Sequence, residues 1–153
     1  MEIEIIELSK RSDLIYKAID YFWKCWGKES NFKFYRDCIV NSTDDQKVLP
    51  KFYLVLDKEK IIATYALLTN DIISRQDLYP WLACLFVNPE YRNNGIAGQL
   101  LDHGLHESKR KGFEHLYLST DLEGFYEKKG WKHTANGFNI DDSVIKIYSR
   151  NTW

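Results

Sequence analysis

The order of apolar and polar positions predicts the elements of the chain, most clearly in the middle of the sequence. Trp81–Val87 is a run of seven apolar residues that ends at Asn88-Pro89, which is typical of a strand covered on both faces. A polar turn follows this run. An amphipathic helix then extends to Lys111, and its apolar side carries Ile96, Leu100, Leu101 and Leu105. The pattern therefore predicts a strand, a turn and a helix in close succession.

The first forty residues predict one strand and two helices. Glu2–Leu8 alternates apolar and polar residues, as a strand with one buried face does. A helix follows, with Ser12 as its expected N-cap and Gly27 in the usual C′ position after its last turn. A second helix is expected over Ser30–Val40, before a polar loop.

Most of the remaining elements are predicted to be strands. Lys51–Leu56 and Lys60–Leu68 should form a hairpin. Later segments should form a strand over His115–Ser119, a short helix over Gly124–Lys129, and strands over Trp131–Thr134 and Ser143–Tyr148. The last two strands should be joined by a turn at Asn136-Gly137 and by the acidic Asp141-Asp142. Strands before, between and after helices predict a mixed α/β sheet with helices on both faces.

The turn after the central strand directs backbone donors at one point. It reads Arg92-Asn93-Asn94-Gly95-Ile96-Ala97-Gly98, and free N–H groups at the start of a helix favour a phosphate or pyrophosphate. Gly95 and Ala97 leave room for an anion to approach the backbone. Arg92 adds a fixed charge and a planar set of donors. An ordinary strand-to-helix connection that needs a glycine for its bend explains the short pattern equally well.

Length and composition narrow the class of protein. The 153 residues fit one domain over 1–153, and a 44% hydrophobic fraction is enough for a full core. A net charge of −1 argues against a nucleic-acid binder. No run reaches the roughly 18 apolar residues of a membrane span, and the acidic N-terminus is unlike a signal peptide. Cys25, Cys38 and Cys84 lack metal-type spacing, which predicts reduced, mostly buried cysteines in a cytoplasmic protein without a metal.

Two stretches resemble the signatures of a known family. Val87–Ala97, with the sequence VNPEYRNNGIA, resembles the Arg/Gln-x-x-Gly-x-Gly/Ala acyl-CoA pyrophosphate loop of the GCN5-related N-acetyltransferases, the GNAT superfamily. Gly124–Trp131 resembles that family's second signature, a short helix with a Tyr before a Gly-aromatic pair. The two signatures occur in the expected order, and the resemblance covers residues 50–150 well.

The resemblance implies a sheet of about seven strands that splays open beside the fourth strand, with acetyl-CoA in the cleft. Backbone groups near Leu85, Phe86 and Val87 would hold the thioester carbonyl and the pantetheine arm, and the turn from Arg92 to Gly98 would hold the pyrophosphate. Phe125 is also expected beside the cofactor. Many members carry an Asn where this chain has Ser119. The hydroxyl of Ser119, or that of Thr120 after it, is expected to replace part of that contact with the pantetheine arm.

The implied reaction is direct transfer of an acetyl group to an amine. Tyr126 stands at the position of the family's general-acid Tyr, and a phenol with a pKa near 10 can protonate the leaving thiolate. The alternative is a packing Tyr beside Trp131. Asp77 is the candidate base, although an Asp there also suits a loop cap. Asp71 and Glu29 are further candidates for attracting a cationic acceptor, and a water chain without a dedicated side chain is also compatible.

The first two helices are rich in aromatic residues, for which core packing is the simpler explanation. One or two of the rings could instead line an acceptor pocket and hold the amine by cation–π attraction. The expected partners are acetyl-CoA and an amine acceptor, either a small molecule or a peptide, and the exposed aromatics allow a homodimer. A non-catalytic acyl-CoA-binding regulatory module is the alternative function, and the retained Tyr126 argues against it.

Overall fold

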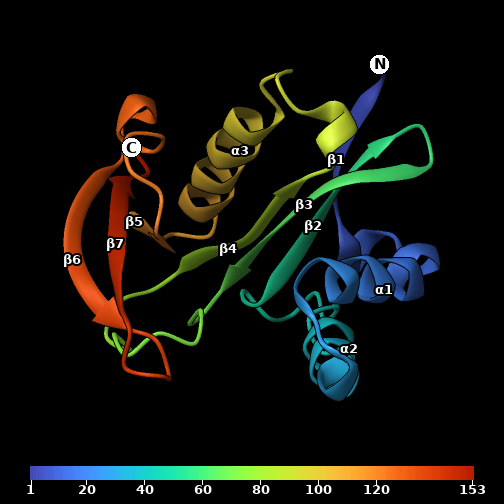
Figure 1. Ribbon diagram of the computed structural model, residues 1–153. Coiled ribbons are helices and arrows are strands. Elements are labelled where there is room, and N and C mark those ends of the chain that lie inside the picture. Colours follow the sequence, from blue (N-terminus) through green and yellow to red (C-terminus); the bar gives the residue numbers. More distant parts are fainter. The chain divides into compact units, whose positions relative to one another are not determined.

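The computed structural model describes residues 1–153, which form three α-helices and a seven-stranded mixed sheet (Figure 1). The helices are α1 (Ile15–Trp26), α2 (Phe32–Val40) and α3 (Ile96–Arg110). The strands are β1 (Ile3–Glu7), β2 (Lys51–Asp57), β3 (Lys60–Leu68), β4 (Trp81–Val87), β5 (His115–Thr120), β6 (Lys132–Phe138) and β7 (Val144–Asn151). Single 3₁₀ turns are η1 (Leu8–Lys10), η2 (Ser12–Leu14), η3 (Glu29–Asn31), η4 (Pro89–Tyr91) and η5 (Glu127–Lys129). The predicted α/β class is confirmed.

The strand order in the sheet is β1-β2-β3-β4-β5-β7-β6. The registered pairing of β4 with β5 is parallel and joins Trp81 to Tyr117. β7 runs antiparallel to both β5 and β6, and β1 runs antiparallel to β2. The sheet is therefore mixed, as predicted, and the order places β7 between β5 and β6.

By its contacts the chain forms two compact units. The first comprises Met1–Ala66 with Cys84–Ala97, and the second comprises Leu67–Ala83 with Gly98–Trp153. The first unit contains α1 and α2, which lie side by side in Figure 1 and contact each other. The core of this unit includes Phe22 of α1, whose ring packs edge-on against Phe52 of β2 at 5.1 Å. Helix α1 thus buries one apolar face, as its period predicts.

The second unit contains the long β6–β7 hairpin of Figure 1 and almost all of α3. Its core is centred on the buried residues Ile73, Trp81 and Ile147, with Leu78 and Tyr117 packed against them. The Trp81 indole donates to the carbonyl of Leu78 at 2.6 Å, so its polar atom is satisfied although the residue is fully buried. The segment before β4 is therefore part of a packed core and not a free loop.

The last hairpin differs from the sequence prediction. Asn136-Gly137 was expected to form a turn, but both residues lie inside β6, and the chain turns at 139–143. A Cβ on Gly137 would lie 3.0 Å from a methyl of Ile147 and 3.1 Å from a methyl of Ile73. A side chain there would crowd these residues. Pairing with β7 joins Asn136 to Lys146 and Gly137 to Ile145, so the turn preference of Asn-Gly is overridden by the strand.

The start of α1 also differs from the prediction. Ser12 lies within a 3₁₀ turn and does not cap the helix, which begins at Ile15 after Leu14. Gly27 does end α1, but its φ of −83° is ordinary and not left-handed. A Cβ on Gly27 would lie 2.0 Å from Cδ1 and 2.5 Å from the backbone oxygen of Trp23. Glycine is therefore required there for space and not for conformation.

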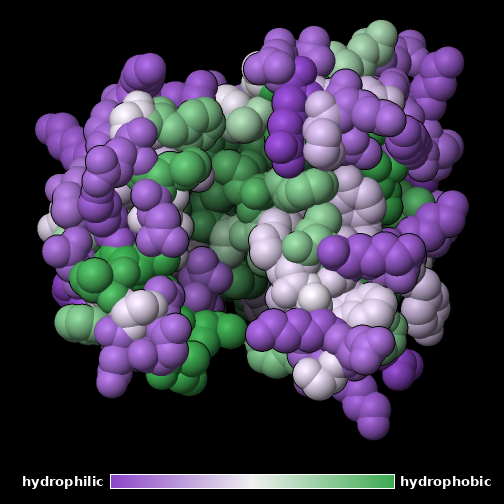
Figure 2. Space-filling view, viewed as in Figure 1, coloured by the Kyte–Doolittle hydropathy of each residue, from purple (hydrophilic) through white to green (hydrophobic).

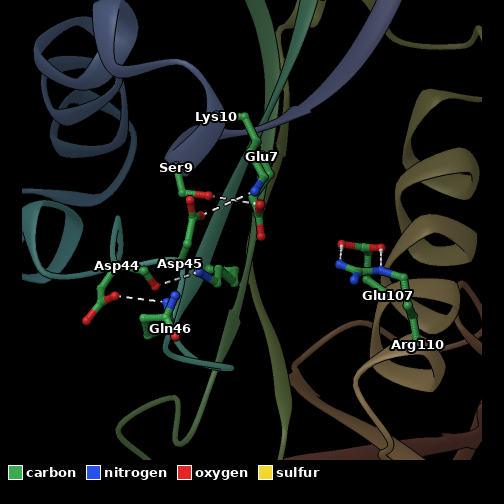
Figure 3. Close-up of polar contacts among 9 residues, drawn as sticks. Glu7, Ser9, Lys10, Asp44, Asp45, Gln46, Glu107 and Arg110 are labelled. Atoms are coloured by element: carbon green, nitrogen blue, oxygen red, sulfur yellow. Dashed lines mark hydrogen bonds and ion pairs between the residues drawn. The ribbon is translucent and has the colours of Figure 1, made fainter.

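Polar contacts tie the loop after α2 to the start of the chain (Figure 3). Lys10 Nζ lies 3.4 Å from Asp45 Oδ1, and the backbone N–H of Gln46 donates to Asp44 Oδ1 at 2.9 Å. Because Lys10 and Asp45 are both largely exposed, this ion pair contributes little to stability. The same view shows the pair between Glu107 and Arg110 in the last turns of α3.

The surface is mostly hydrophilic on the face that Figure 2 shows, with apolar side chains in separate patches. None of the helices combines the length and the apolar character that crossing a membrane requires. None of the three cysteines forms a disulfide bond. Cys25 and Cys84 are partly buried and Cys38 is exposed, so the prediction that the cysteines are mostly buried is wrong.

We expect Gly27→Ala to destabilise the protein by about 2 kcal/mol or more, because the added methyl overlaps backbone as well as ring atoms of Trp23. Gly112→Ala is the matched control. Gly112 has a φ of +90° and open space around it, so only backbone strain of about 1 kcal/mol is expected. Urea unfolding measures the loss of unfolding free energy in both variants. A cost at Gly27 no larger than that at Gly112 would contradict the steric explanation.

Candidate functional site

The loop between β4 and α3 exposes its backbone at the start of the helix. Asn93 and Gly95 have φ angles of +66° and +74°, and these left-handed residues reverse the chain before α3. The side-chain amide of Asn94 donates to the backbone oxygen of Tyr91 at 3.0 Å and so holds the turn together. A Cβ on Gly95 would meet no atom within 4 Å. The outer side of this loop is therefore open to a ligand.

Arg92 is held at one end and free at the other. Its Nε donates to the backbone oxygen of Val87 at 2.9 Å, and its guanidinium lies 5.6 Å from the centre of the Phe86 ring. The side chain is exposed, and no protein acceptor binds its two terminal nitrogens. The first turn of α3 contains no acidic residue, so its positive end is not neutralised locally. These features fit a diphosphate.

Strand β4 is less buried than its apolar sequence predicts. Trp81–Ala83 and Val87 are buried, but Cys84–Phe86 are only partly buried. Cys84 has a φ of +54° within the strand, and its backbone oxygen accepts a hydrogen bond from the Thr64 hydroxyl at 2.9 Å. The expected cover on both faces is therefore wrong for these middle residues, which include Leu85 and Phe86 of the predicted pantetheine site.

Two aromatic residues of α1 contact the predicted pantetheine strand. The rings of Tyr21 and Trp26 meet Phe86 edge-on, with ring centres 6.1 Å and 6.0 Å apart. All three residues are partly buried. Of the aromatic residues in the first two helices, these two are the ones that the contacts connect to a predicted site residue. Core packing accounts for Phe22, which is fully buried.

Asp71 is the carboxylate whose surroundings most change its acidity. Burial raises its pKa to about 6, and a hydrogen bond with Ser119 of β5 opposes that rise. The segment that carries it is fixed by Asn70, whose Oδ1 accepts from the backbone N–H of Ile73 at 2.9 Å. Its neighbour Ile72 has a φ of +55°, which is strained for a β-branched residue. A carboxyl group with a pKa near neutrality is suited to proton transfer.

Asp77, the predicted base, has the opposite environment. It is exposed, and Arg75 Nε and Nη2 donate to its two oxygens at 3.0 Å and 2.8 Å. These hydrogen bonds lower the pKa of Asp77, so the group binds a proton less readily than an ordinary carboxylate. The higher pKa of Asp71 would make it the better proton acceptor of the two near neutral pH, and the roles of both residues stay predictions. Glu29 lies exposed in η3 of the first unit.

Tyr126 lies in an aromatic cluster of the second unit. Its ring is 4.9 Å from Phe125, 6.4 Å from Trp131 and 6.0 Å from Tyr148. Burial raises the pKa of Tyr126, so the phenol stays protonated at neutral pH and can donate a proton. The predicted contact with Trp131 is present as well, and packing and acid catalysis are compatible at this position.

Of the remaining predicted residues, Ile96 and Ala97 begin α3, where Ile96 is buried, and Gly98 follows them in the same turn. A Cβ there would come within 3.2 Å of Lys129 Nζ, the end of a flexible side chain. The sequence did not predict that Lys129 lies close to Gly98, nor that Asp71 forms a hydrogen bond with Ser119. Each joins residues far apart in the chain, and the only local signal was Ser119 in place of the family's Asn.

Comparison with known proteins supports the resemblance. A sequence model of the acetyltransferase (GNAT) family matches residues 15–131. The amino-acid acetyltransferase of Vibrio cholerae serotype O1 is 29% identical over 83 residues, which are 48% of this chain and 19% of that protein. The matched part therefore spans about a fifth of the length of this curated relative.

Solved structures of acetyltransferases share the fold. The aminoglycoside 6′-N-acetyltransferase from Enterococcus faecium has a TM-score of 0.74 at 16% identity, and the match covers 100% of this chain and 98% of that one. An aminoglycoside 6′-N-acetyltransferase complexed with coenzyme A has a TM-score of 0.72 at 16% identity, with the same coverage of both chains. At these identities the likeness shows the fold alone.

We expect Asp71→Asn to stabilise the protein relative to wild type as the pH rises. The folded-state pKa of about 6 lies above the unfolded value of about 4, so folding favours the protonated form and wild-type stability falls between these two values. The difference should grow from pH 4 to pH 7 and reach about 2 kcal/mol. Urea unfolding at several pH values measures it, with the exposed Asp121→Asn as a control for charge. Parallel curves for wild type and Asp71→Asn would contradict the burial of this carboxylate.

Proposed function

The chain belongs to the acetyltransferase (GNAT) family, and we propose that it transfers an acetyl group from acetyl-CoA to a primary amine of a small molecule or peptide. The observation that carries the proposal is the open loop before α3. There, free terminal nitrogens of Arg92 and a helix start without acids form a positive, accessible site within the segment that matches the family. We also propose that residues 1–153 act as one domain, since the family match runs through both units.

The acetyl donor would bind along the residues that the family pattern indicates. We assign the pyrophosphate to the turn formed by Arg92, Asn93, Asn94, Gly95, Ile96, Ala97 and Gly98. The thioester and pantetheine arm would lie on the backbone of Leu85, Phe86 and Val87, and Phe125 stays a predicted contact of the cofactor. Partial exposure of β4 at Leu85 and Phe86 supports this assignment. The structurally similar aminoglycoside 6′-N-acetyltransferase that was solved in complex with coenzyme A supports a donor built on coenzyme A.

Ser119 would contact both the acetyl donor and the candidate base. Its hydroxyl hydrogen-bonds with Asp71, and when Asp71 is ionised the hydroxyl must be the donor. The serine oxygen keeps lone pairs that can accept from an amide N–H of the pantetheine arm. The shorter side chain thus replaces one contact of the family's Asn and fixes the candidate base at the same time.

The reaction requires no covalent enzyme intermediate. The neutral amine attacks the thioester carbonyl, a C–N bond forms, and the C–S bond breaks to release CoA. Binding both substrates side by side supplies much of the rate acceleration. As the C–N bond forms, the nitrogen becomes positive and acidic, so the Asp71 carboxylate can accept its proton. The Tyr126 phenol gives a proton to the departing thiolate.

The first test is ligand binding followed by turnover. At concentrations about 100-fold above Kd, acetyl-CoA should stabilise the protein by about 2.7 kcal/mol, which raises its melting temperature. A panel of amines should then give free thiol, measured colorimetrically. Stabilisation without thiol release from any amine would favour a binding module instead. The absence of stabilisation by both acetyl-CoA and CoA would refute the proposal.

We expect Tyr126→Phe to fold and to bind acetyl-CoA like wild type, yet to turn over about 100-fold more slowly, because the thiolate loses its proton donor. Calorimetric titration gives the binding constant, and thiol release gives kcat. Tyr79→Phe removes the hydroxyl of an exposed Tyr in the same unit and serves as the control. An unchanged kcat in Tyr126→Phe would remove the acid role.

The pH dependence of kcat should identify the base. With Asp71 as base, kcat rises with pH through about 6 as the carboxylate loses its proton. Asp71→Asn should lower kcat about 100-fold and abolish this acid limb, whereas Asp77→Asn should keep the limb. A limb that disappears in Asp77→Asn and persists in Asp71→Asn would reverse the assignment and restore Asp77.

A further inference from the structure

The Glu127 carboxylate joins the turn that carries Tyr126 to the centre of a strand. Glu127 Oε1 accepts a hydrogen bond from the backbone N–H of Gly124 at 3.0 Å. Glu127 Oε2 accepts another from the Tyr148 hydroxyl at 2.8 Å. Tyr126 lies in sequence between Gly124 and Glu127, so the two bonds close a loop around it and fix that loop to β7.

We propose that Glu127 and Tyr148 position the Tyr126 phenol for proton donation, an inference that rests on the proposed function. Both act through Tyr126 and need not touch a substrate. The positioning role follows from three features: the weakness of the turn itself, the rigidity of Tyr148, and the charge on Glu127.

The turn that carries Tyr126 has little regular structure of its own. Its helical part, η5, has three residues, and 3₁₀ turns of this length are not stable alone. Gly124 enters the turn with a φ of +85°, and Gly130 leaves it with a φ of +86°. The backbone oxygen of Tyr126 accepts from the N–H groups of Lys129 and Trp131 at 3.0 Å and 3.1 Å. These bonds fix the end of the turn, and the Glu127 carboxylate fixes its beginning.

Tyr148 provides a rigid anchor. It is 1% exposed and lies in β7, where it pairs with Leu118 of β5 on one side and with His133 of β6 on the other. Its ring stacks on the His133 imidazole with centres 5.4 Å apart and planes inclined by 29°. The same ring lies 6.0 Å from that of Tyr126. A residue paired on both sides cannot shift without moving the sheet, so its hydroxyl is a fixed reference point.

The charge on Glu127 strengthens its hydrogen bond with Tyr148. The Tyr148 hydroxyl and nearby backbone N–H groups lower the pKa of Glu127, with Lys146 contributing in the same direction. Glu127 therefore stays ionised across the working pH range, and hydrogen bonds to an ionised acceptor are the stronger kind. Glu123, which is nearby, pairs with Lys146 and does not hold the Tyr126 turn.

The test compares Tyr148→Phe in two backgrounds. This variant keeps the buried ring and removes only the hydroxyl. In the otherwise native chain we expect kcat to fall about tenfold, because small misplacements of a reacting group are costly, while KM for acetyl-CoA changes less than about twofold. In the Tyr126→Phe background the same change should cost nothing further. Equal losses in both backgrounds, or no loss in either, would overturn the positioning role.

Glu127→Gln and its control Glu123→Gln complete the experiment. A glutamine can still accept from the Gly124 N–H, but its uncharged NH2 can only donate to the Tyr148 oxygen. The charged acceptor is therefore lost, and Glu127→Gln should also lower kcat. Glu123→Gln removes an equal charge from the same loop and should leave kcat near wild type. Amide hydrogen exchange at residues 124–126 should accelerate in Tyr148→Phe and Glu127→Gln. Unchanged hydrogen exchange in both variants would overturn the positioning role of Glu127 and Tyr148, even where kcat falls. If the wild-type protein shows no turnover with any amine, the proposed function itself is refuted.

Discussion

The unpaired amide hydrogens at the start of α3 are the constraint on which the rest of the structure depends. A helix begins with N–H groups that have no partner within it, and a partial positive charge gathers there. Most helices neutralise this end with an acid or a capping side chain, but the first turn of α3 has no acidic residue. The loop before it adds the positive charge of Arg92 and holds that guanidinium by one nitrogen to the Val87 backbone. Free N–H groups and an unpaired guanidinium favour an anion, and the pyrophosphate of the proposed acyl donor would bind to both.

A local pattern was enough to predict this part of the molecule. Strand β4 begins and ends where the apolar run does, and the helix follows the glycine turn as expected. This prediction succeeded because the bend, the apolar run and the helical period all depend on residues that are close together in the sequence. Gly137 shows the limit of such reasoning, because its place within β6 is determined by Ile73 and Ile147 from other segments. The Asn-Gly pattern contains no information about them.

The candidate acid was predictable from neighbouring residues in the sequence, whereas the candidate base depends on segments that are distant in the sequence. Tyr126 could be identified from a motif because the motif is contiguous. Asp71 and Asp77 look alike in the sequence, and only the fold separates them. One is withdrawn from solvent beside Ser119, and the other is exposed beside Arg75. Desolvation raises a carboxyl pKa and an ion pair lowers it, so two residues of the same type in one loop differ in their ability to accept a proton. The pattern of residue types does not predict which of two aspartates in the same loop is buried.

In the proposed reaction, three carboxylates of the second unit would have separate tasks that follow from their partners. Asp77 and Glu127 accept hydrogen bonds from an arginine and a tyrosine, respectively, which lower their pKa values and make them fixed negative anchors. Asp71 has a hydroxyl partner and a desolvated site, which raises its pKa to about 6. An anchor must keep its charge as conditions change, whereas a base must lose and regain a proton during each turnover. In the proposed mechanism the partner of each carboxylate decides which requirement it meets. The strained φ of Ile72 beside Asp71 would then be a cost in stability that helps to fix the proposed base.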